Sequence, residues 1–290
     1  MIKLGNLDES RGFLILKVTS LIFLIFLLKS CSNVEKRVNA ALDITAKGNF
    51  KNYVFNTKNY QIFSAQRLIN KNQIINIYIE GDGRSWIDRD TISSNPTPTV
   101  PFALNLANLD TDNNVIYLAR PCQYAFNQKC NESVWTSHQF SKPVLMSYME
   151  VLDAIKEQNN NNKFNLIAYS GGATIALMLA ANREDIQSIR TIGGNLDHNE
   201  LSKITKTSPL TNSIAAKEFI FKTEKIPQIH YYGEKDKVIP EKIFLDYKNS
   251  FSNQNCITVK KIELLNHYDD WGFFWKSNLK KPPVCALINK

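Results

Sequence analysis

This chain of 290 residues lacks the patterns that are typical of several common functions. It has no glycine-rich phosphate loop, and its cysteines and histidines do not have the spacing of a zinc site. It also has no internal repeat and no aromatic signature of an RNA-binding module. We therefore expect no metal, no cofactor and no nucleic-acid partner.

Charge of one sign is not concentrated in any part of the chain. The formal net charge is +8 at pH 7, but the basic residues are scattered rather than gathered into a stripe. Such a charge distribution predicts a mild attraction to anionic surfaces and does not predict nucleic-acid binding. The composition indicates neither disorder nor a fibre, and the length allows a sizeable core in one large domain or two small ones.

Residues 1–30 have the pattern of an export signal. A basic leader precedes an apolar stretch at 18–28, which has the length of a signal peptide and is short for a membrane span. The residues that follow resemble the bacterial lipobox, in which a small residue such as Ser30 precedes a cysteine that is lipidated, here Cys31. This resemblance implies a lipid-anchored protein of the bacterial cell envelope that faces the periplasm. An ordinary cleaved signal or an uncleaved anchor is the alternative.

Export changes how the other four cysteines are interpreted. Cys122, Cys130, Cys256 and Cys285 are an even number of thiols in an oxidising compartment, and they allow three pairings. Closeness in sequence favours Cys122 with Cys130, which closes a small loop, and Cys256 with Cys285, which fastens the C-terminal tail. The insertion at 121–139 also carries aromatic side chains that either line a pocket or fold the loop onto the body, and we favour the second interpretation.

The most informative stretch is 165–181, NLIAYSGGATIALMLAA. Its first apolar residues predict a buried strand, and the run at 173–181 has the length and composition of a buried helix. The tight corner between them contains Ser170, Gly171 and Gly172. Strand, corner and helix are the context of a nucleophile elbow, in which backbone N–H groups point at charge that develops beside the serine hydroxyl. The pattern departs from Gly-x-Ser-x-Gly at Ala168, and the alternative is a plain turn that opens a core helix.

Strands alternate with helices along the rest of the chain, and this rhythm predicts a mostly parallel sheet with helices on both faces. A short helix at 34–47 and an edge hairpin at 53–68 come first, and the polar segment 196–226 is interpreted as a small cap. The expected strands are 74–79, 115–119, 166–168, 186–192, 228–232 and 257–264, and the expected helices are 101–109, 144–158, 173–181, 240–251 and 271–278.

Two later corners carry side chains that could activate a serine. A serine hydroxyl is a weak nucleophile, so it requires a base within hydrogen-bond reach and an acid that orients the base. Asp236 follows the strand at 228–232, and His267 follows the strand at 257–264. Both therefore lie at the edge of the sheet where α/β proteins build their sites. The rival candidates are the acids Glu234 and Asp269 and the base His198.

With these residues in place, the chain resembles an α/β-hydrolase-fold serine hydrolase of the exported bacterial lipoprotein kind, over roughly residues 53–278. The order Ser170, Asp236, His267 is the order that this family uses. The resemblance implies that Ser170 is the nucleophile, that Asp236 in the pattern G-x-x-D-x-x-V-P is the acid, and that His267 is the base.

The resemblance also implies an oxyanion hole, whose donors are backbone N–H groups. The N–H of Gly171 matches one donor. Residues 80–83, EGDG, stand where the family often has His-Gly, so the N–H of Asp82 matches the other. A carboxylate at position 82 departs from the family pattern, and it would be unfavourable beside an oxyanion unless it points away.

We therefore expect residues 31–290 to form one α/β-hydrolase domain that hydrolyses a carboxylic ester through an acyl-enzyme on Ser170. A serine peptidase of the same fold, or a binding protein that keeps the fold without the activity, is the alternative. The expected partners are a small-molecule ester or peptide substrate and a membrane reached through lipid on Cys31.

Overall fold

The computed structural model describes residues 33–70, 72–160 and 163–286. The signal segment 1–30 and Cys31 lie outside these ranges. No helix within them is long and apolar enough to cross a membrane.

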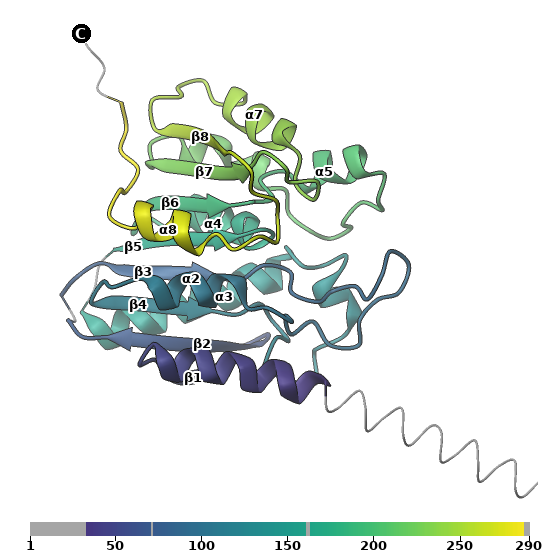
Figure 1. Ribbon diagram of the computed structural model, residues 1–290, viewed down its shortest axis with the longest axis vertical. Helices are drawn as coiled ribbons and strands as arrows, with labels where there is room; N and C mark the ends of the chain where they lie inside the picture. The colour runs from purple at the N-terminus through teal and green to yellow at the C-terminus, as the bar shows by residue number, and fades with distance from the viewer. Residues whose placement is uncertain (1–32, 71, 161–162, 287–290) are drawn as a thin grey trace, which may run out of the picture.

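A single eight-stranded sheet, with strand order β1-β2-β4-β3-β5-β6-β7-β8, forms the centre of the molecule (Figure 1). β2 pairs antiparallel with β1 and with β4, and all other neighbours are parallel. The strands are β1 Lys51–Asn56, β2 Gln61–Leu68, β3 Ile75–Ile79, β4 Asn114–Leu118, β5 Phe164–Tyr169, β6 Ile186–Ile192, β7 Gln228–Gly233 and β8 Ile257–Ile262. The expected hairpin at 53–68 is therefore present as β1 and β2 at one edge.

Helices cover both faces of this sheet and form two cores. A helix at 33–47 packs with α2 and α8 on one face, where Ala41, Leu104 and Trp275 are buried. Figure 1 shows α2 and α8 in front of the strands. Helices α3, α4 and α7 bury their apolar sides in the second core. The longer helices are α2 Phe102–Leu109, α3 Lys142–Asn159, α4 Gly172–Asn182, α5 His198–Thr205, α7 Glu241–Asn249 and α8 Gly272–Asn278.

The burial of the central strands explains why they form. Every residue of β3 and β4 is buried, because helices cover both sides of these parallel strands. The β-branched and aromatic side chains of INIYI and NVIYL suit this environment. The mostly parallel sheet with helices on both faces confirms the predicted α/β-hydrolase fold.

The parallel strands bring their carboxyl ends to one edge of the sheet, and the loops that follow them carry the candidate site. The segment after β6 contains α5 and two short helices, η2 Ala216–Phe219 and α6 Ile220–Thr223. Both short helices pack against α4. The part of the region 196–226 that contains these two short helices therefore lies against the core helix of the second face.

The structure pairs the described cysteines as their closeness in sequence suggested. Cys122 is bonded to Cys130, and Cys256 is bonded to Cys285. The second bond ties the C-terminal segment to the start of β8.

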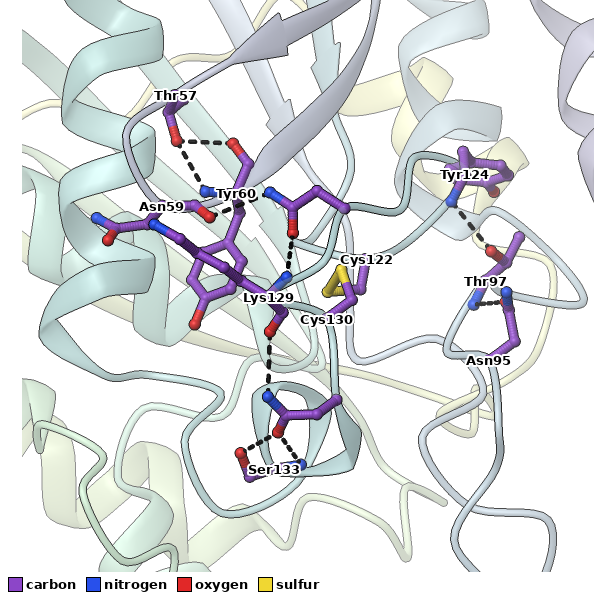
Figure 2. Close-up of a disulfide and its surroundings, with 12 residues drawn as sticks. Thr57, Asn59, Tyr60, Asn95, Thr97, Cys122, Tyr124, Lys129, Cys130 and Ser133 are labelled. Atoms are coloured by element: carbon purple, nitrogen blue, oxygen red, sulfur yellow. Dashed lines mark hydrogen bonds between the residues drawn. A yellow bond between two sulfur atoms is a disulfide. The ribbon is translucent and has the colours of Figure 1, made fainter.

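The loop closed by Cys122 and Cys130 joins two distant parts of the chain (Figure 2). On one side, the Asn127 amide donates to the carbonyl of Asn59 in the hairpin turn, 3.1 Å away. On the other side, the backbone N–H of Tyr124 donates to the Thr97 hydroxyl at 3.0 Å. The disulfide loop therefore fixes the segment that approaches the candidate site from residue 97 onward.

Candidate active site

Ser170 lies at the sharp corner between β5 and α4, as the elbow pattern predicted. Its φ is 50°, a left-handed conformation that costs a non-glycine residue about 1–2 kcal/mol. Gly172 is required at this corner, because a Cβ there would lie 2.6 Å from the carbonyl oxygens of Ile79 and Glu80. Ala168 is 2% exposed, so a methyl group fits where the usual motif has glycine.

Ser170, His267 and Asp236 form a continuous chain of hydrogen bonds. The distance from Ser170 Oγ to His267 Nε2 is 3.1 Å, and His267 Nδ1 lies 2.8 Å from Asp236 Oδ2. Asp236 Oδ1 accepts from the backbone N–H groups of Val238 and Ile239, each at 2.8 Å. With a proton on Nδ1, the imidazole donates to Asp236, and its free Nε2 can accept the proton of the Ser170 hydroxyl.

The rival residues lie outside this chain. Asp269 accepts from the backbone and side-chain N–H groups of Asn266, and it therefore shapes the loop that carries His267. Glu234 accepts from the backbone N–H of Leu264. His198 is buried with its Nε2 against the carbonyl of Ile214, and burial lowers its pKa.

Two further hydrogen bonds hold the His267 loop in place. The Tyr169 hydroxyl donates to the carbonyl of His267 at 2.9 Å. The Trp271 indole donates to the carbonyl of Asn266 at 3.1 Å. Because Tyr169 also stacks on Phe102 with ring centroids 3.8 Å apart, helix α2 supports the histidine loop through this ring.

Gly193, just after β6, packs against His267 and Asp236, and the sequence did not identify it as part of the site. Its φ is 54°, and a Cβ there would lie 3.0 Å from His267 Nδ1 and 3.3 Å from Asp236 Oδ2. Any side chain would therefore press on the bond between these two groups. The signal in the sequence was the glycine pair that ends this strand.

The candidate oxyanion donors lie beside Ser170, from two different loops. In the described part of the chain, neither the N–H of Gly171 nor that of Asp82 donates to a protein acceptor. The Asp82 carboxylate lies against Gly171, since a Cβ at 171 would be only 1.9 Å from Asp82 Oδ1. The same oxygen is 3.0 Å from Nη1 of Arg120, a buried arginine that the sequence did not identify.

Glu80 is a second buried acid beside the site. It is 1% exposed and accepts from the N–H of Gly81 at 3.0 Å, the N–H of Ala103 at 3.2 Å and the Tyr117 hydroxyl at 3.1 Å. Burial raises its pKa to about 7, although these hydrogen bonds oppose the rise. Glu80 thus joins the loop after β3 to the first turn of α2.

Ser170 and His267 line a cleft of about 470 Å³, whereas Asp236 lies behind the histidine and does not line it. Five aromatic side chains contribute to its wall: Trp86, Phe102, Trp135, Tyr169 and Tyr268. Trp135 belongs to the insertion at 121–139 and is largely buried, with its indole donating to the Ser93 carbonyl at 3.0 Å. The insertion therefore folds onto the body, as expected, and also reaches the cleft. No described residue from 196–226 lines this cleft.

A second groove, of about 640 Å³, lies between α2 and α8. It shares Val100, Phe102 and Tyr268 with the first cleft. Its lining is largely apolar and also includes Asp269, Asp270 and Lys276. Within the described ranges, no group of three or more His, Cys, Asp or Glu side chains could hold a metal ion.

The sheet order, the serine corner and the position of the histidine loop define an α/β-hydrolase-fold protein. The sequence model of the family described as "Serine hydrolase (FSH1)" matches residues 97–264, more than half of the chain. The chain belongs to this family of serine hydrolases. The matched region includes Ser170 and Asp236, whereas His267 and Asp82 lie outside it. Among curated proteins, no sequence matches this chain.

Solved structures of serine hydrolases have a similar fold. Est1E from Butyrivibrio proteoclasticus with ferulic acid bound has a TM-score of 0.60 at 13% identity, over 79% of this chain and 96% of Est1E. XC6422 from Xanthomonas campestris, described as an α/β serine hydrolase without a lid, has a TM-score of 0.51 at 11% identity, over 79% of this chain and 91% of XC6422. A membrane phospholipase A described as a bacterial virulence factor has a TM-score of 0.52 at 14% identity, over 89% and 91% of the two chains. At these identities the likeness concerns the fold.

Proposed function

We propose that this serine hydrolase cleaves carboxylic esters through an acyl-enzyme on Ser170. The observation that carries the proposal is the hydrogen-bonded chain of Ser170, His267 and Asp236, whose serine and histidine line an aromatic cleft. Such a chain supplies the base and the orienting acid that a serine hydroxyl needs. The two backbone N–H groups beside Ser170 supply the donors that a tetrahedral intermediate needs.

In the first half of the reaction, His267 Nε2 takes the hydroxyl proton as Ser170 Oγ attacks the ester carbonyl carbon. The carbonyl oxygen becomes an oxyanion that accepts from the N–H groups of Gly171 and Asp82, while Asp236 stabilises the imidazolium. The C–O bond to the alcohol then breaks, and the alcohol leaves with the proton from Nε2. Water repeats the sequence on the acyl-enzyme, releases the acid and restores Ser170.

The walls of the cleft favour an ester with an aromatic or extended apolar group. Aromatic side chains line the cleft that contains Ser170, and the groove between α2 and α8 adjoins this cleft, because both are lined by Phe102 and Tyr268. An acyl or alcohol group too long for the first cleft would extend into this groove. The structural neighbour Est1E was solved with ferulic acid, an aromatic carboxylic acid, which agrees with this choice of substrate.

A fluorophosphonate probe tests the nucleophile, and a panel of substrates tests the class. The probe should label the wild type stoichiometrically, Ser170→Ala not at all, and His267→Ala far more slowly. Asp236→Asn should lower turnover by orders of magnitude with the fold intact. The matched control Ser250→Ala, at an exposed serine of another surface, should be labelled like the wild type. Labelling that persists in Ser170→Ala would place the nucleophile elsewhere.

The panel consists of aryl esters of increasing acyl length and of the corresponding anilides. An esterase hydrolyses the esters, and faster turnover of anilides or aminoacyl amides would instead indicate a peptidase. Absence of both labelling and turnover in the wild type would favour a binding protein that keeps the fold.

We also propose that residues 1–30 are a signal peptide and that Cys31 carries lipid, so that residues 31–290 face the periplasm as one anchored domain. The two disulfides support this proposal, because such bonds persist in oxidising compartments. Residue 33 already belongs to a helix that packs on the body, so the lipid would hold the domain close to the membrane. Metabolic labelling with a fatty-acid analogue tests this: Cys31→Ser should lose the label, and equal labelling of both proteins would refute the anchor.

A further inference from the structure

The loop after β3 places the Asp82 carboxylate close to the position where the oxyanion of the proposed reaction would develop. In the proposed reaction, the oxyanion forms beside the N–H groups of Gly171 and Asp82. The Asp82 carboxylate lies against Gly171, and its side chain is only 33% exposed. Two negative charges at such a separation repel strongly where water is partly excluded. An unpaired carboxylate here would oppose the reaction that the two N–H groups are placed to assist.

Arg120 is fixed next to that carboxylate. Its side chain is 6% exposed, its Nη1 lies 3.0 Å from Asp82 Oδ1, and its Nη2 donates to the Gln139 carbonyl at 2.6 Å. The guanidinium also lies over the Phe140 ring, 5.1 Å from its centroid. These contacts hold the cation at the carboxylate without presenting it in the cleft, whose lining does not include Arg120.

The same corner after β4 holds the backbone of the loop that carries Asp82. The Gln123 side chain donates to the carbonyl of Gly81 at 3.1 Å and accepts from the backbone N–H of Arg120 at 3.0 Å. Gly83 has a φ of 66°, and a Cβ there would lie 2.5 Å from Gln123 Nε2. Gln123 therefore holds the loop at Gly81 and packs closely against Gly83, and Arg120 holds the carboxylate of Asp82 itself.

We propose that Arg120 is a positioning residue of the oxyanion hole: its guanidinium neutralises and fixes the Asp82 carboxylate so that the Asp82 N–H can serve the developing oxyanion. The proposal rests on the function proposed above. It explains how a carboxylate is accommodated at a position where it would otherwise disfavour the reaction.

A double-mutant cycle between Arg120 and Asp82 tests the proposal. The four proteins are the wild type, Arg120→Met, Asp82→Asn and the double variant, and the readouts are kcat, KM and the rate of fluorophosphonate labelling. In the presence of the Asp82 carboxylate, Arg120→Met should lower kcat on the order of 100-fold, comparable with the loss of one oxyanion donor, and should change KM much less. In the Asp82→Asn background, the same substitution should cost less than about 10-fold, because no charge remains to be neutralised.

Arg190 provides a matched control. It is also a buried arginine whose guanidinium donates to main-chain carbonyls, those of Asn278 and Leu279, and lies over an aromatic ring, that of Trp275. Arg190→Met should reduce the free energy of unfolding and show no coupling to Asp82→Asn. If the role of Arg120 is purely structural, Arg120→Met should likewise reduce the free energy of unfolding and show no coupling to Asp82→Asn.

Each outcome separates the inference from the proposed function. A wild type that is neither labelled nor active refutes the proposed function. An active wild type in which Arg120→Met costs the same in both backgrounds refutes the role of Arg120. If Arg120→Met does not fold, Arg120→Lys replaces it in the test, because lysine keeps a cation at this position. A kcat within about 10-fold of the wild type supports neutralisation of Asp82. A loss of kcat of the order of 100-fold that is the same with and without Asp82→Asn contradicts it.

Discussion

Replacing Glu80 with glutamine should change how the stability of the protein depends on pH. Glu80 is buried and accepts three hydrogen bonds, from the N–H groups of Gly81 and Ala103 and from the Tyr117 hydroxyl. Glutamine has the same shape, and its oxygen can accept the two backbone bonds while its amide donates to the tyrosine oxygen. The substitution Glu80→Gln therefore removes a titrating group with little change in packing.

The size and sign of the effect follow from the pKa of Glu80. Burial raises this pKa from 4.5 to about 7 in the folded protein. Below pH 4.5 the acid is protonated in both states and contributes nothing. Between pH 4.5 and 7 the unfolded chain releases the proton while the folded protein keeps it, so the free energy of unfolding falls as pH rises. Above pH 7 the full penalty is present, about 3 kcal/mol at about 1.4 kcal/mol per pKa unit.

Urea unfolding at a series of pH values from 4.5 to 8, with the disulfides intact, measures this effect. The free energy of unfolding of Glu80→Gln minus that of the wild type should increase by about 3 kcal/mol across the series. Any constant offset reports the altered hydrogen bonds and leaves the trend unaffected. Glu157→Gln, at an exposed position of α3, is the matched control. A difference for Glu80→Gln that is flat with pH, or that decreases, would refute this reasoning.

Three other changes have definite expected outcomes. Gly193→Ala should lower kcat by at least 10-fold, because the new Cβ would press on His267 and Asp236. It should also lower the free energy of unfolding by about 1–2 kcal/mol, because the φ of this residue is 54°. A wild-type kcat in this variant would refute the packing argument. Replacing Cys122 and Cys130 together with serine should lower the free energy of unfolding by about 2.5 kcal/mol for a loop of about eight residues, measured by urea unfolding without reductant. Asn105→Trp, which fills the groove between α2 and α8, should lower kcat/KM for long-chain esters relative to acetate esters by about 10-fold. Leu245→Trp, at an exposed site on α7, should leave that ratio unchanged, and an equal effect of both variants would argue against the groove.

The parts of the fold that the sequence predicted are those with continuous or periodic apolar patterns. The runs around Ser170 predicted β5 and α4 to within a few residues, because a buried parallel strand and a buried helix differ in length and composition. The positions of Asp236 and His267 followed from the rule that sites form at the carboxyl ends of parallel strands. Both side chains do lie there and are hydrogen-bonded to each other.

The parts that could not be predicted depend on contacts between distant residues. Arg120 and Asp82 are 38 positions apart, and nothing in the sequence distinguishes this arginine from the many exposed basic residues. Glu80 accepts a hydrogen bond from Tyr117, 37 positions away, and its burial is a property of the folded sheet. Gly193 is similar: its glycine signal was visible, but the need for glycine comes from the His267 ring that packs against it.

The order of the strands explains why these distant residues meet. β3 lies between β4 and β5, so the loop that carries Asp82 has the Arg120 corner on one side and the Ser170 corner on the other. One acidic side chain can therefore touch the backbone of Gly171 and pair with Arg120 at the same time. If Arg120 has the role proposed above, the carboxylate at position 82 is tolerated beside the oxyanion because the neighbouring strand supplies a cation. On that proposal, a neutral residue at position 82 removes the need for the cation, so we expect Asp82 and Arg120 to change together among relatives of this chain.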